Sequence, residues 1–463
     1  MTLLARDAGL ELDHDVTRVV AQLFLPGESI APMKPQAELI AERVRALAPE
    51  QARQIARDLL DAFGPRHPDL EALFGRNADY VLGRIGEHME SGSAHHTVMG
   101  GTVTNEYSVE GAALCNPSIA PHPDQTGLLD GQLRVVVSLR QIGEGHISSL
   151  GFVTGVIGPG ELFTFDSRHT PLVTPTITSA EGRWSSYRAE FPPQAALSQR
   201  VLMPVIDDER NGIEDARLVL FTYDDGSTEY RATYTAYDGR SIIPRLLTSR
   251  DLLSFESHPL TGPAATNKGI APFPRPIKGE LYALVRSDGE TNGLAHSPDG
   301  LAWGRETAIR GPVLPWEIVK SGNCGSPIET DEGWLVITHG VGPMRVYSMG
   351  AMLLESGRSE ESDLGTSRTD DPFDGRDAAG LRAQRRVLVR RPPARRSRLA
   401  AARCRGQPHP GRLSRSDRAA RRDGRGVVSP PRVPRRGSRL SDPRPCRRTG
   451  RNHRRGYPAT TAG

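Results

Sequence analysis

Two adjacent carboxylates, Glu214 and Asp215, are of a type and spacing that could transfer a proton. They lie in the acidic stretch 207–217, immediately before the apolar run LVLF, and Arg217 follows two positions on. A neighbouring charge moves the pKa of a carboxyl group in either direction, so paired carboxylates beside an arginine suit acid–base chemistry. A solvated acidic turn has the same composition, and both interpretations stay open at this point.

A second group of residues is cationic and dispersed. Lysine is scarce in this chain, and Lys268 precedes a glycine in TNKG; Arg286, His339 and Arg345 follow in LVRS, THG and PMRVY. Side chains of this kind form an anion pocket if the fold brings them together. Taken one by one, they are also typical of surface residues and salt bridges.

A third group combines amide, hydroxyl, guanidinium and imidazole side chains. Asn116 and Ser118 belong to NPSIAPHPDQ, and Arg140 and His146 belong to SLRQIGEGHISS. Such polar groups beside aromatic residues are typical of carbohydrate pockets. The alternative is a set of capped turns with an internal salt bridge.

Other classes of chemistry have no support in the sequence. There is no phosphate-binding GxxxxGK[ST], no GxGxxG after a strand, no HExxH and no GxSxG. The pair His95-His96 lacks companion ligands, so we expect no metal site. The four cysteines form no CxxC pair, which fits a reducing cytoplasm. No apolar run approaches the roughly 20 residues that span a bilayer, and the start lacks a signal-peptide pattern, so we expect no membrane association.

The elements that would position these residues are mainly strands. Helical periodicity is confined to a block at 34–90, with Asp69 as the expected cap of its later helix. After Ser91 short β-rich runs alternate with turns, and comparable runs recur at 218–221, 281–285 and 335–338, near the spacing of four-stranded propeller blades. The turn SPDGLAW also favours a propeller over a β-sandwich.

The last part of the chain has a different composition. Residues 356–463 contain 29 arginines and no lysine, with a charge balance of +19, whereas the first 355 residues have a balance of −15. An arginine-rich arm could bind nucleic acid, but the tail has neither lysine nor interleaved aromatic residues, and we expect no nucleic-acid partner. A one-base shift explains the tail better, because LRAQRRVLVRRPPA and GYVPNVVYSCGGLLH can be encoded by one stretch of DNA in two frames.

Several ordered motifs together resemble glycoside hydrolase family 130, the β-mannoside phosphorylases and β-1,2-mannosidases. The resemblance spans about 18–355 and rests on GIEDAR, NKGIAPFPRPIKGELYALVR, SPDGLAW, NCGSPIETDEGWLVITHGV and YSMGAMLLE, with NEYSVEGAALCNPSIAPHPDQ upstream. The upstream motifs look like those of longer members with a helical insertion. The re-read string GYVPNVVYSCG looks like the family's C-terminal motif, which supports the frameshift hypothesis.

The resemblance implies a five-bladed β-propeller with the active site at one end of its axis. Asp215 matches the family's general acid in G-x-E-D-P-R, where Ala216 replaces the usual proline, and Glu214 is its neighbour. The phosphate-binding positions match Lys268, Arg286 and His339. The resemblance implies that the mannoside is bound by Asn116, Ser118, Arg140, His146, Arg217 and Tyr347.

One departure from the family pattern bears on the reaction. The phosphorylase segment P-P-I-K-T reads Ser326 to Thr330 here, so Glu329 replaces a lysine of the phosphate site. A carboxylate there disfavours phosphate and could orient a water molecule. Phosphorolysis to mannose 1-phosphate, hydrolysis with Glu329 as base, and a non-catalytic glycan-binding propeller therefore all remain open, with phosphorolysis as the leading prediction.

The predicted organisation is a lead-in at 1–33, a helical insertion at 34–90, a propeller domain with an incomplete last blade at 91–355, and an aberrant disordered tail at 356–463. We expect a cytoplasmic enzyme without a cofactor, taking inorganic phosphate as co-substrate and a β-mannoside oligosaccharide as substrate. The helical insertion is the expected contact if the protein is a homo-oligomer.

The frameshift hypothesis predicts how the chain responds to protease. Few apolar side chains and 29 arginines oppose compaction of the tail, so trypsin should remove it at the earliest time points and leave a core ending near Arg358. The last blade would then have an unpaired edge, and the chain should be poorly soluble and weakly active until the frame after Glu355 is restored. A protease-resistant tail, full activity of the unrepaired chain, or an intact frame on re-sequencing would each contradict the hypothesis.

Overall fold

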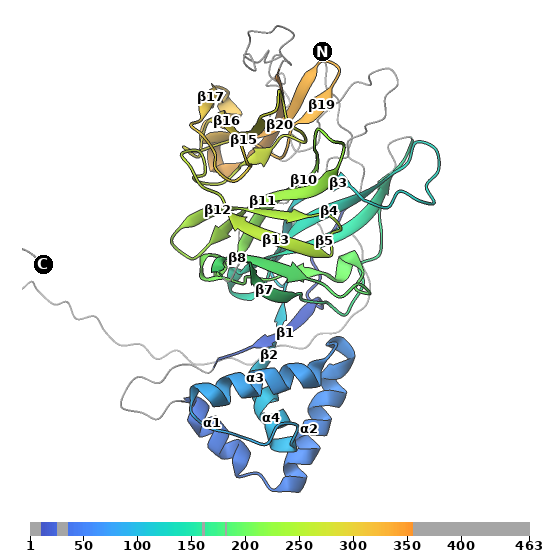
Figure 1. Ribbon diagram of the computed structural model, residues 1–463, viewed down its shortest axis with the longest axis vertical. Coiled ribbons are helices and arrows are strands. Elements are labelled where there is room, and N and C mark those ends of the chain that lie inside the picture. Colours follow the sequence, from blue (N-terminus) through green and yellow to red (C-terminus); the bar gives the residue numbers. More distant parts are fainter. Residues whose placement is uncertain (1–10, 26–35, 160–162, 181–182, 355–463) are drawn as a thin grey trace, which may run out of the picture. The chain divides into compact units, whose positions relative to one another are not determined.

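The structure is a computed structural model that describes residues 11–25, 36–159, 163–180 and 183–354 (Figure 1). It is mainly β, with a propeller-like arrangement of four blades in addition to a group of helices. The tail expected at 356–463, together with Glu355, lies outside the described residues. The described residues include four blades, so the expected fifth blade is not among them.

Four helices form a group with its own apolar core. Their buried side chains include Val44, Val81, Leu82 and Met99. Among the described residues, no helix is both long and apolar enough to cross a bilayer. The helices are α1 (Gln36–Arg45), α2 (Pro49–Phe63), α3 (Leu70–Arg84) and α4 (Ala94–Thr102).

Two details of the helices differ from the expectations. Asp69 stands at the N-terminal cap of α3 with φ 57°, but its side chain makes no capping hydrogen bond. Helix α4 lies where strands were expected; Ser93 caps it by accepting a hydrogen bond from the backbone N–H of His96. A Cβ on Gly100 would approach the Phe74 carbonyl oxygen to 2.0 Å, so only glycine lets α4 pack this closely on α3. Tertiary packing therefore determines that residues 94–102 form a helix.

A short antiparallel ribbon connects α4 to the first blade along the chain. It pairs β1 (Val19–Leu23) with β2 (Thr104–Ser108). Beside it, the buried Arg18 donates to the buried Glu110 at 3.1 Å. The ribbon thus joins segments that are about 85 residues apart in sequence, in a register from Val19–Ser108 to Leu23–Thr104.

The blades are antiparallel sheets (Figure 1); four consecutive strands pair in chain order in the first three blades, whereas the fourth has a different order. The first contains β3 (Ala113–Pro121), β4 (Leu133–Ile142), β5 (Ser148–Ile157) and β6 (Phe163–Phe165), and β9 (Val201–Leu202) also pairs with β5. The second contains β10 (Ile213–Thr222), β11 (Thr228–Tyr237), β12 (Ile242–Ser249) and β13 (Ser254–Pro259), extended by β8 (Arg183–Glu190) and β7 (Thr176–Ala180).

The last two blades are shorter in sequence. The third contains β14 (Ala271–Pro272), β15 (Leu281–Val285), β16 (Asn292–Ser297) and β17 (Thr307–Arg310). In the fourth, β18 (Lys320–Asn323) and β19 (Ile328–Thr330) both pair with β20 (Gly333–Val341), which also pairs with β21 (Tyr347–Leu354).

The blade repeat differs from the expected recurrence of strands. The run at 218–221 belongs to β10, the first strand of its blade, whereas the runs at 281–285 and 335–338 belong to β15 and β20, which are second strands. All three runs are apolar because blades pack on both faces, and apolar composition does not distinguish a first strand from a second.

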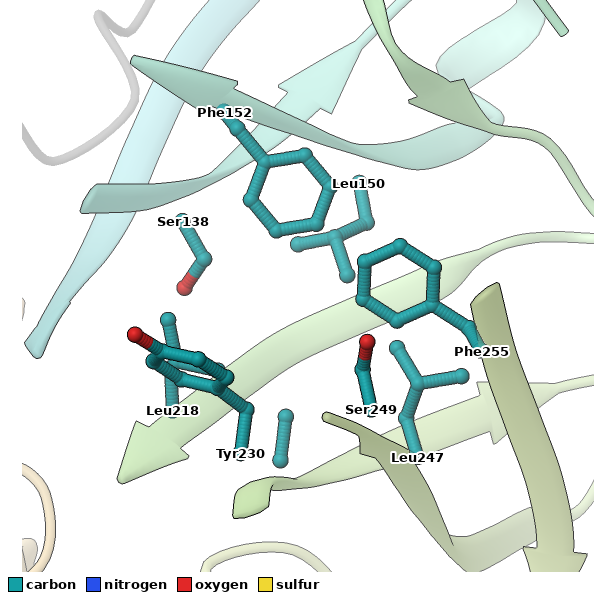
Figure 2. Close-up of a pocket in the computed structure, with 9 residues that line it drawn as sticks. Ser138, Leu150, Phe152, Leu218, Tyr230, Leu247, Ser249 and Phe255 are labelled. Atoms are coloured by element: carbon teal, nitrogen blue, oxygen red, sulfur yellow. The ribbon is translucent and has the colours of Figure 1, made fainter. Parts of the chain in front are cut away.

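Apolar clusters join the four sheets in series. The first and second blades share the core drawn in Figure 2, where Phe152 of β5 and Phe255 of β13 lie side by side with ring centroids 5.7 Å apart. Trp303, from the expected SPDGLAW turn, is buried in the cluster that joins the second and third blades. Trp334 of β20 packs on Phe273 between the third and fourth. The first strands β3, β10, β14 and β18 thereby follow one another around the arrangement.

Candidate active site

The site is built on two β-bulges in neighbouring first strands. The pairing of β3 with β4 shifts between Cys115 and Ser118, and that of β10 with β11 shifts between Glu214 and Arg217. In each bulge a non-glycine residue has positive φ, Asn116 at 48° and Asp215 at 54°. Bulges re-aim side chains, and here the Asn116 Nδ2 donates a hydrogen bond to the Asp215 Oδ1.

Arg140 of β4 holds both carboxylates with one guanidinium group. Its Nη1 lies 3.0 Å from Asp215 Oδ1 and its Nη2 lies 2.8 Å from Glu214 Oε1. Lys268 forms an ion pair with the other oxygen of Glu214. The Glu214 side chain is 9% exposed and that of Asp215 is 29% exposed. Asp215 is thus the carboxylate that faces outward, supported by an almost buried partner.

The electrostatics of the site favour the ionised form of Asp215. Burial would raise its pKa, but the charge of Arg140, the hydrogen bond from Asn116 and the charges of Lys268 and Arg217 together lower it. The pKa of Arg140 is raised, because attraction to Asp215 and Glu214 outweighs burial. Without a bound anion, Asp215 is therefore a carboxylate at neutral pH.

A second part of the site is rich in positive charge. Arg286, which follows β15, is 7% exposed, and its Nη1 lies 3.3 Å from His339 Nε2. Arg217 donates to the carbonyl oxygen of Gly269 at 3.2 Å. A Cβ on Gly322 of β18 would lie 2.0 Å from Arg286 Nη1, so the missing side chain makes room for the guanidinium group.

His339 is close to Arg286 but is not itself a cation. Burial, followed by the charges of Arg286 and Arg217, lowers its pKa to about 3. A guanidinium group only donates, so Nε2 accepts from Arg286 and the proton of the neutral ring lies on Nδ1. Nδ1 is 3.6 Å from the Sγ of Cys324. His339 is available to a ligand as a neutral group and not as a charge.

Three of the residues expected to bind a sugar differ in their surroundings. Tyr347 is 42% exposed and its ring stacks on that of His339 at 6.0 Å, so an aromatic face lies beside the cationic part of the site. His146 is exposed in the turn between β4 and β5. Ser118 exchanges hydrogen bonds with the backbone of Leu218, which fastens β3 to β10. Its hydroxyl therefore has a structural partner.

Glu329 lies apart from these groups. Its side chain is 46% exposed and forms an ion pair with Arg275. On β20 its partner is Trp334, whereas Gly322 pairs with His339. Five residues of strand separate these two positions, a distance of about 16 Å. Among the described residues the structure therefore brings together Asp215, Glu214, Arg140, Asn116, Lys268, Arg217, Arg286, His339 and Tyr347, but not Glu329.

The sequence analysis did not assign two residues that lie near the cationic part of the site. Lys320 begins β18, and its charge interacts with those of Arg286, Arg345 and Lys268. Cys324 lies against His339. The scarcity of lysine was a usable signal for Lys320, which also stands three residues before the NCGSPIE motif. No group of three or more metal-ligating side chains occurs within the part of the chain that the structure describes.

Comparisons with known proteins show where this chain is similar to others. The model of glycoside hydrolase family 130, described as β-1,4-mannooligosaccharide phosphorylase, matches residues 194–368. A β-1,2-mannobiose phosphorylase of Listeria innocua is 34% identical over 164 residues, which is 33% of this chain and 43% of the relative. A β-1,4-mannooligosaccharide phosphorylase of Ruminococcus albus is 36% identical over 98 residues, 19% of this chain and 29% of the relative.

A solved structure of the Listeria innocua β-1,2-mannobiose phosphorylase with β-1,2-mannobiose covers 54% of this chain and 73% of its own, at 20% identity and a TM-score of 0.35. The chain spans about half the length, or less, of the curated relatives named above. The match at 194–368 includes Glu214, Asp215, Arg217, Lys268 and Arg286, but not Arg140 or Asn116. Over residues 194–368, less than half of its length, the chain is thus similar to glycoside hydrolase family 130.

The low pKa of His339 predicts how stability depends on pH. An unfolded histidine has a pKa of about 6.5, so between that value and about 3 the unfolded chain binds a proton that folded His339 does not. Stability should therefore fall as the pH is lowered through this window. Between pH 6.5 and 4 the Tm should decrease more in the wild type than in His339→Gln.

The matched control is His146→Gln, since His146 is exposed; its pH dependence should equal that of the wild type. Parallel Tm curves for wild type and His339→Gln would mean that folding does not lower the pKa of this imidazole.

Proposed function

We propose that the protein is an inverting β-mannoside phosphorylase that releases mannose 1-phosphate. The observation that carries this proposal is the division of the site: one half-buried carboxylate, Asp215, stands beside Arg217 and Arg286, neither of which forms an ion pair within the part of the chain that the structure describes. Phosphorolysis needs both, a proton donor for the leaving sugar and a site for an anion. The names of the relatives, all of them β-mannoside phosphorylases, support the same reaction and substrate class.

In this proposal Asp215 donates the proton, directly or through a hydroxyl of the substrate. The glycosidic bond breaks, its oxygen takes the proton, and phosphate attacks the anomeric carbon from the opposite face. Both oxygens of Glu214 are held, by Arg140 and Lys268, so Glu214 is a positioning group. Asn116 and Arg140 bind Oδ1 of Asp215, which leaves Oδ2 as the oxygen to present the proton.

Protonation of Asp215 depends on the anion in this mechanism. Arg217 helps to keep the pKa of Asp215 low in the free protein. A bound phosphate dianion offsets the field of Arg217 and Arg286 and so raises that pKa. Asp215 is then protonated, and able to act as the general acid, only when phosphate is bound.

Hydrolysis with Glu329 as base is the second candidate. It rests on the substitution of glutamate for a lysine in the P-P-I-K-T segment. The ion pair with Arg275 and the position of Glu329 opposite Trp334 favour phosphorolysis over it. Incubation with β-mannosides with and without phosphate separates the possibilities: mannose 1-phosphate, free mannose whose release is lost in Glu329→Gln, or binding without turnover.

The five-bladed form also remains part of this proposal. The fourth blade ends, within the described residues, at β21, whose one described partner is β20. Strands encoded by the restored frame, including GYVPNVVYSCG, would pair there and complete the ring. The helices α1–α3 are proposed to be the family's insertion and the contact of a cytoplasmic homo-oligomer.

The role of Asp215 is tested by Asp215→Asn. An amide cannot donate the proton, so turnover of natural β-mannosides should fall about 10²- to 10⁴-fold, while binding of the mannoside stays near that of the wild type. An aryl mannoside with a good leaving group needs less protonation and should lose less activity. Asp207→Asn, in the same acidic stretch but exposed, is the control; near-normal activity of Asp215→Asn would remove Asp215 from this role.

The anion-binding part is tested by Arg286→Ala and Arg217→Ala. Loss of a charged hydrogen-bond donor should raise the KM for phosphate by about 10- to 100-fold, and the KM for the mannoside much less. Arg188→Ala, an exposed ion-pair residue of β8, should leave both constants unchanged. Equal increases in the two KM values would show that these residues bind the sugar or maintain the fold instead.

A further inference from the structure

The charges of the site fall into a balanced half and an unbalanced half. In the first, Arg140 and Lys268 are matched by the carboxylates of Glu214 and Asp215, which they contact directly. Two positive charges and two negative charges leave no net charge there. An anion bound beside this half alone would therefore gain little electrostatic stabilisation.

The unbalanced half contains Arg217, Arg286 and Lys320. Among the residues that the structure describes, none of the three has a carboxylate within ion-pair distance; Arg217 contacts the Gly269 carbonyl and Arg286 contacts neutral His339. Arg286 is 93% buried, and its Nε has no hydrogen-bond partner in the described residues. Cations held in this way are costly unless an anion joins them.

Lys320 lies on the same side of β18 as Arg286. Residues two apart in a strand share a face, and on that face Gly322 leaves the space that the Arg286 guanidinium occupies. Lys320 is half-buried. Burial and then the charges of Arg286, Arg345 and Lys268 lower its pKa. The Lys320 ammonium group therefore belongs to the same electrostatic site, and a dianion bound there would oppose this lowering of its pKa.

We propose that Lys320 is a specificity-determining residue of the phosphate site and supplies, with Arg217 and Arg286, its third unpaired positive charge. His339 cannot supply that charge because it is neutral; it orients Arg286. Glu329 replaces a lysine of the family's phosphate site in the sequence. Lys320 supplies the positive charge that this lysine would otherwise supply. This inference rests on the proposed phosphorylase function and names the group that selects a phosphate dianion over water.

The test compares Lys320→Met and Lys320→Arg with Lys278→Met in the full chain and in the full chain with the restored frame. Lys278 is an exposed lysine in a turn and is the matched control. Phosphorolysis of β-1,2-mannobiose is followed with inorganic phosphate and mannobiose varied in turn. Binding of phosphate alone is measured by calorimetry.

Lys320→Met should raise the KM and the Kd for phosphate by about 10- to 100-fold and leave the KM for mannobiose within about twofold of the wild type. Lys320→Arg should recover most of the phosphate affinity, and Lys278→Met should match the wild type. The unchanged mannobiose KM shows that the site is folded, which a structural role of Lys320 would not preserve.

Other outcomes overturn the inference in distinguishable ways. If the wild type needs phosphate and Lys320→Met keeps the wild-type phosphate KM, Lys320 is outside the site while the proposed function stands. If both KM values rise together, Lys320 maintains the fold. If the wild type turns over mannobiose without phosphate, the proposed function fails, and this inference fails with it.

Discussion

Two like charges on consecutive residues of one strand are the constraint on which this site depends. In a regular strand Glu214 and Asp215 would point to opposite faces, and one would be buried without a partner. The bulge, with Asp215 at φ 54°, turns both toward the single guanidinium group of Arg140. Neutralisation of the pair by Arg140 and Lys268 is what allows an acidic dyad to exist beside a buried cationic region.

The cationic region is held by backbone contacts between blades. Arg217 of β10 and Asn323 of β18 both donate to the carbonyl oxygen of Gly269, at 3.2 and 3.0 Å. Ser118 fastens β3 to β10 in the same way. Because these polar side chains hold neighbouring first strands, the distances between charges depend on the packing of whole sheets. The site is therefore a property of the blade arrangement and not of any one blade.

Sequence alone located the dyad, since Glu214 and Asp215 are neighbours in the chain and a family motif surrounds them. It also located Arg286 and His339 through motifs, but it treated His339 as a cation, because burial against an arginine is invisible in sequence. The contact of Asn116 with Asp215 spans 99 residues. It depends on two β-bulges, and the residue types in these strands do not predict them. Glu329 was assigned to the site because it replaces a lysine of the family's P-P-I-K-T segment; pairing along β20 places it opposite Trp334 and away from His339. Helix α4 was missed because its packing, and not its composition, stabilises it.

The absence of a side chain at Gly322 determines where the charge of Arg286 can lie. Its φ is ordinary, so the backbone does not require glycine there; the requirement comes from the 2.0 Å approach of an added Cβ to Arg286 Nη1. A single methyl group would displace a guanidinium group that carries a full charge. An alanine here, among the mildest of substitutions by chemistry, would therefore shift the charge of Arg286 through the loss of space alone.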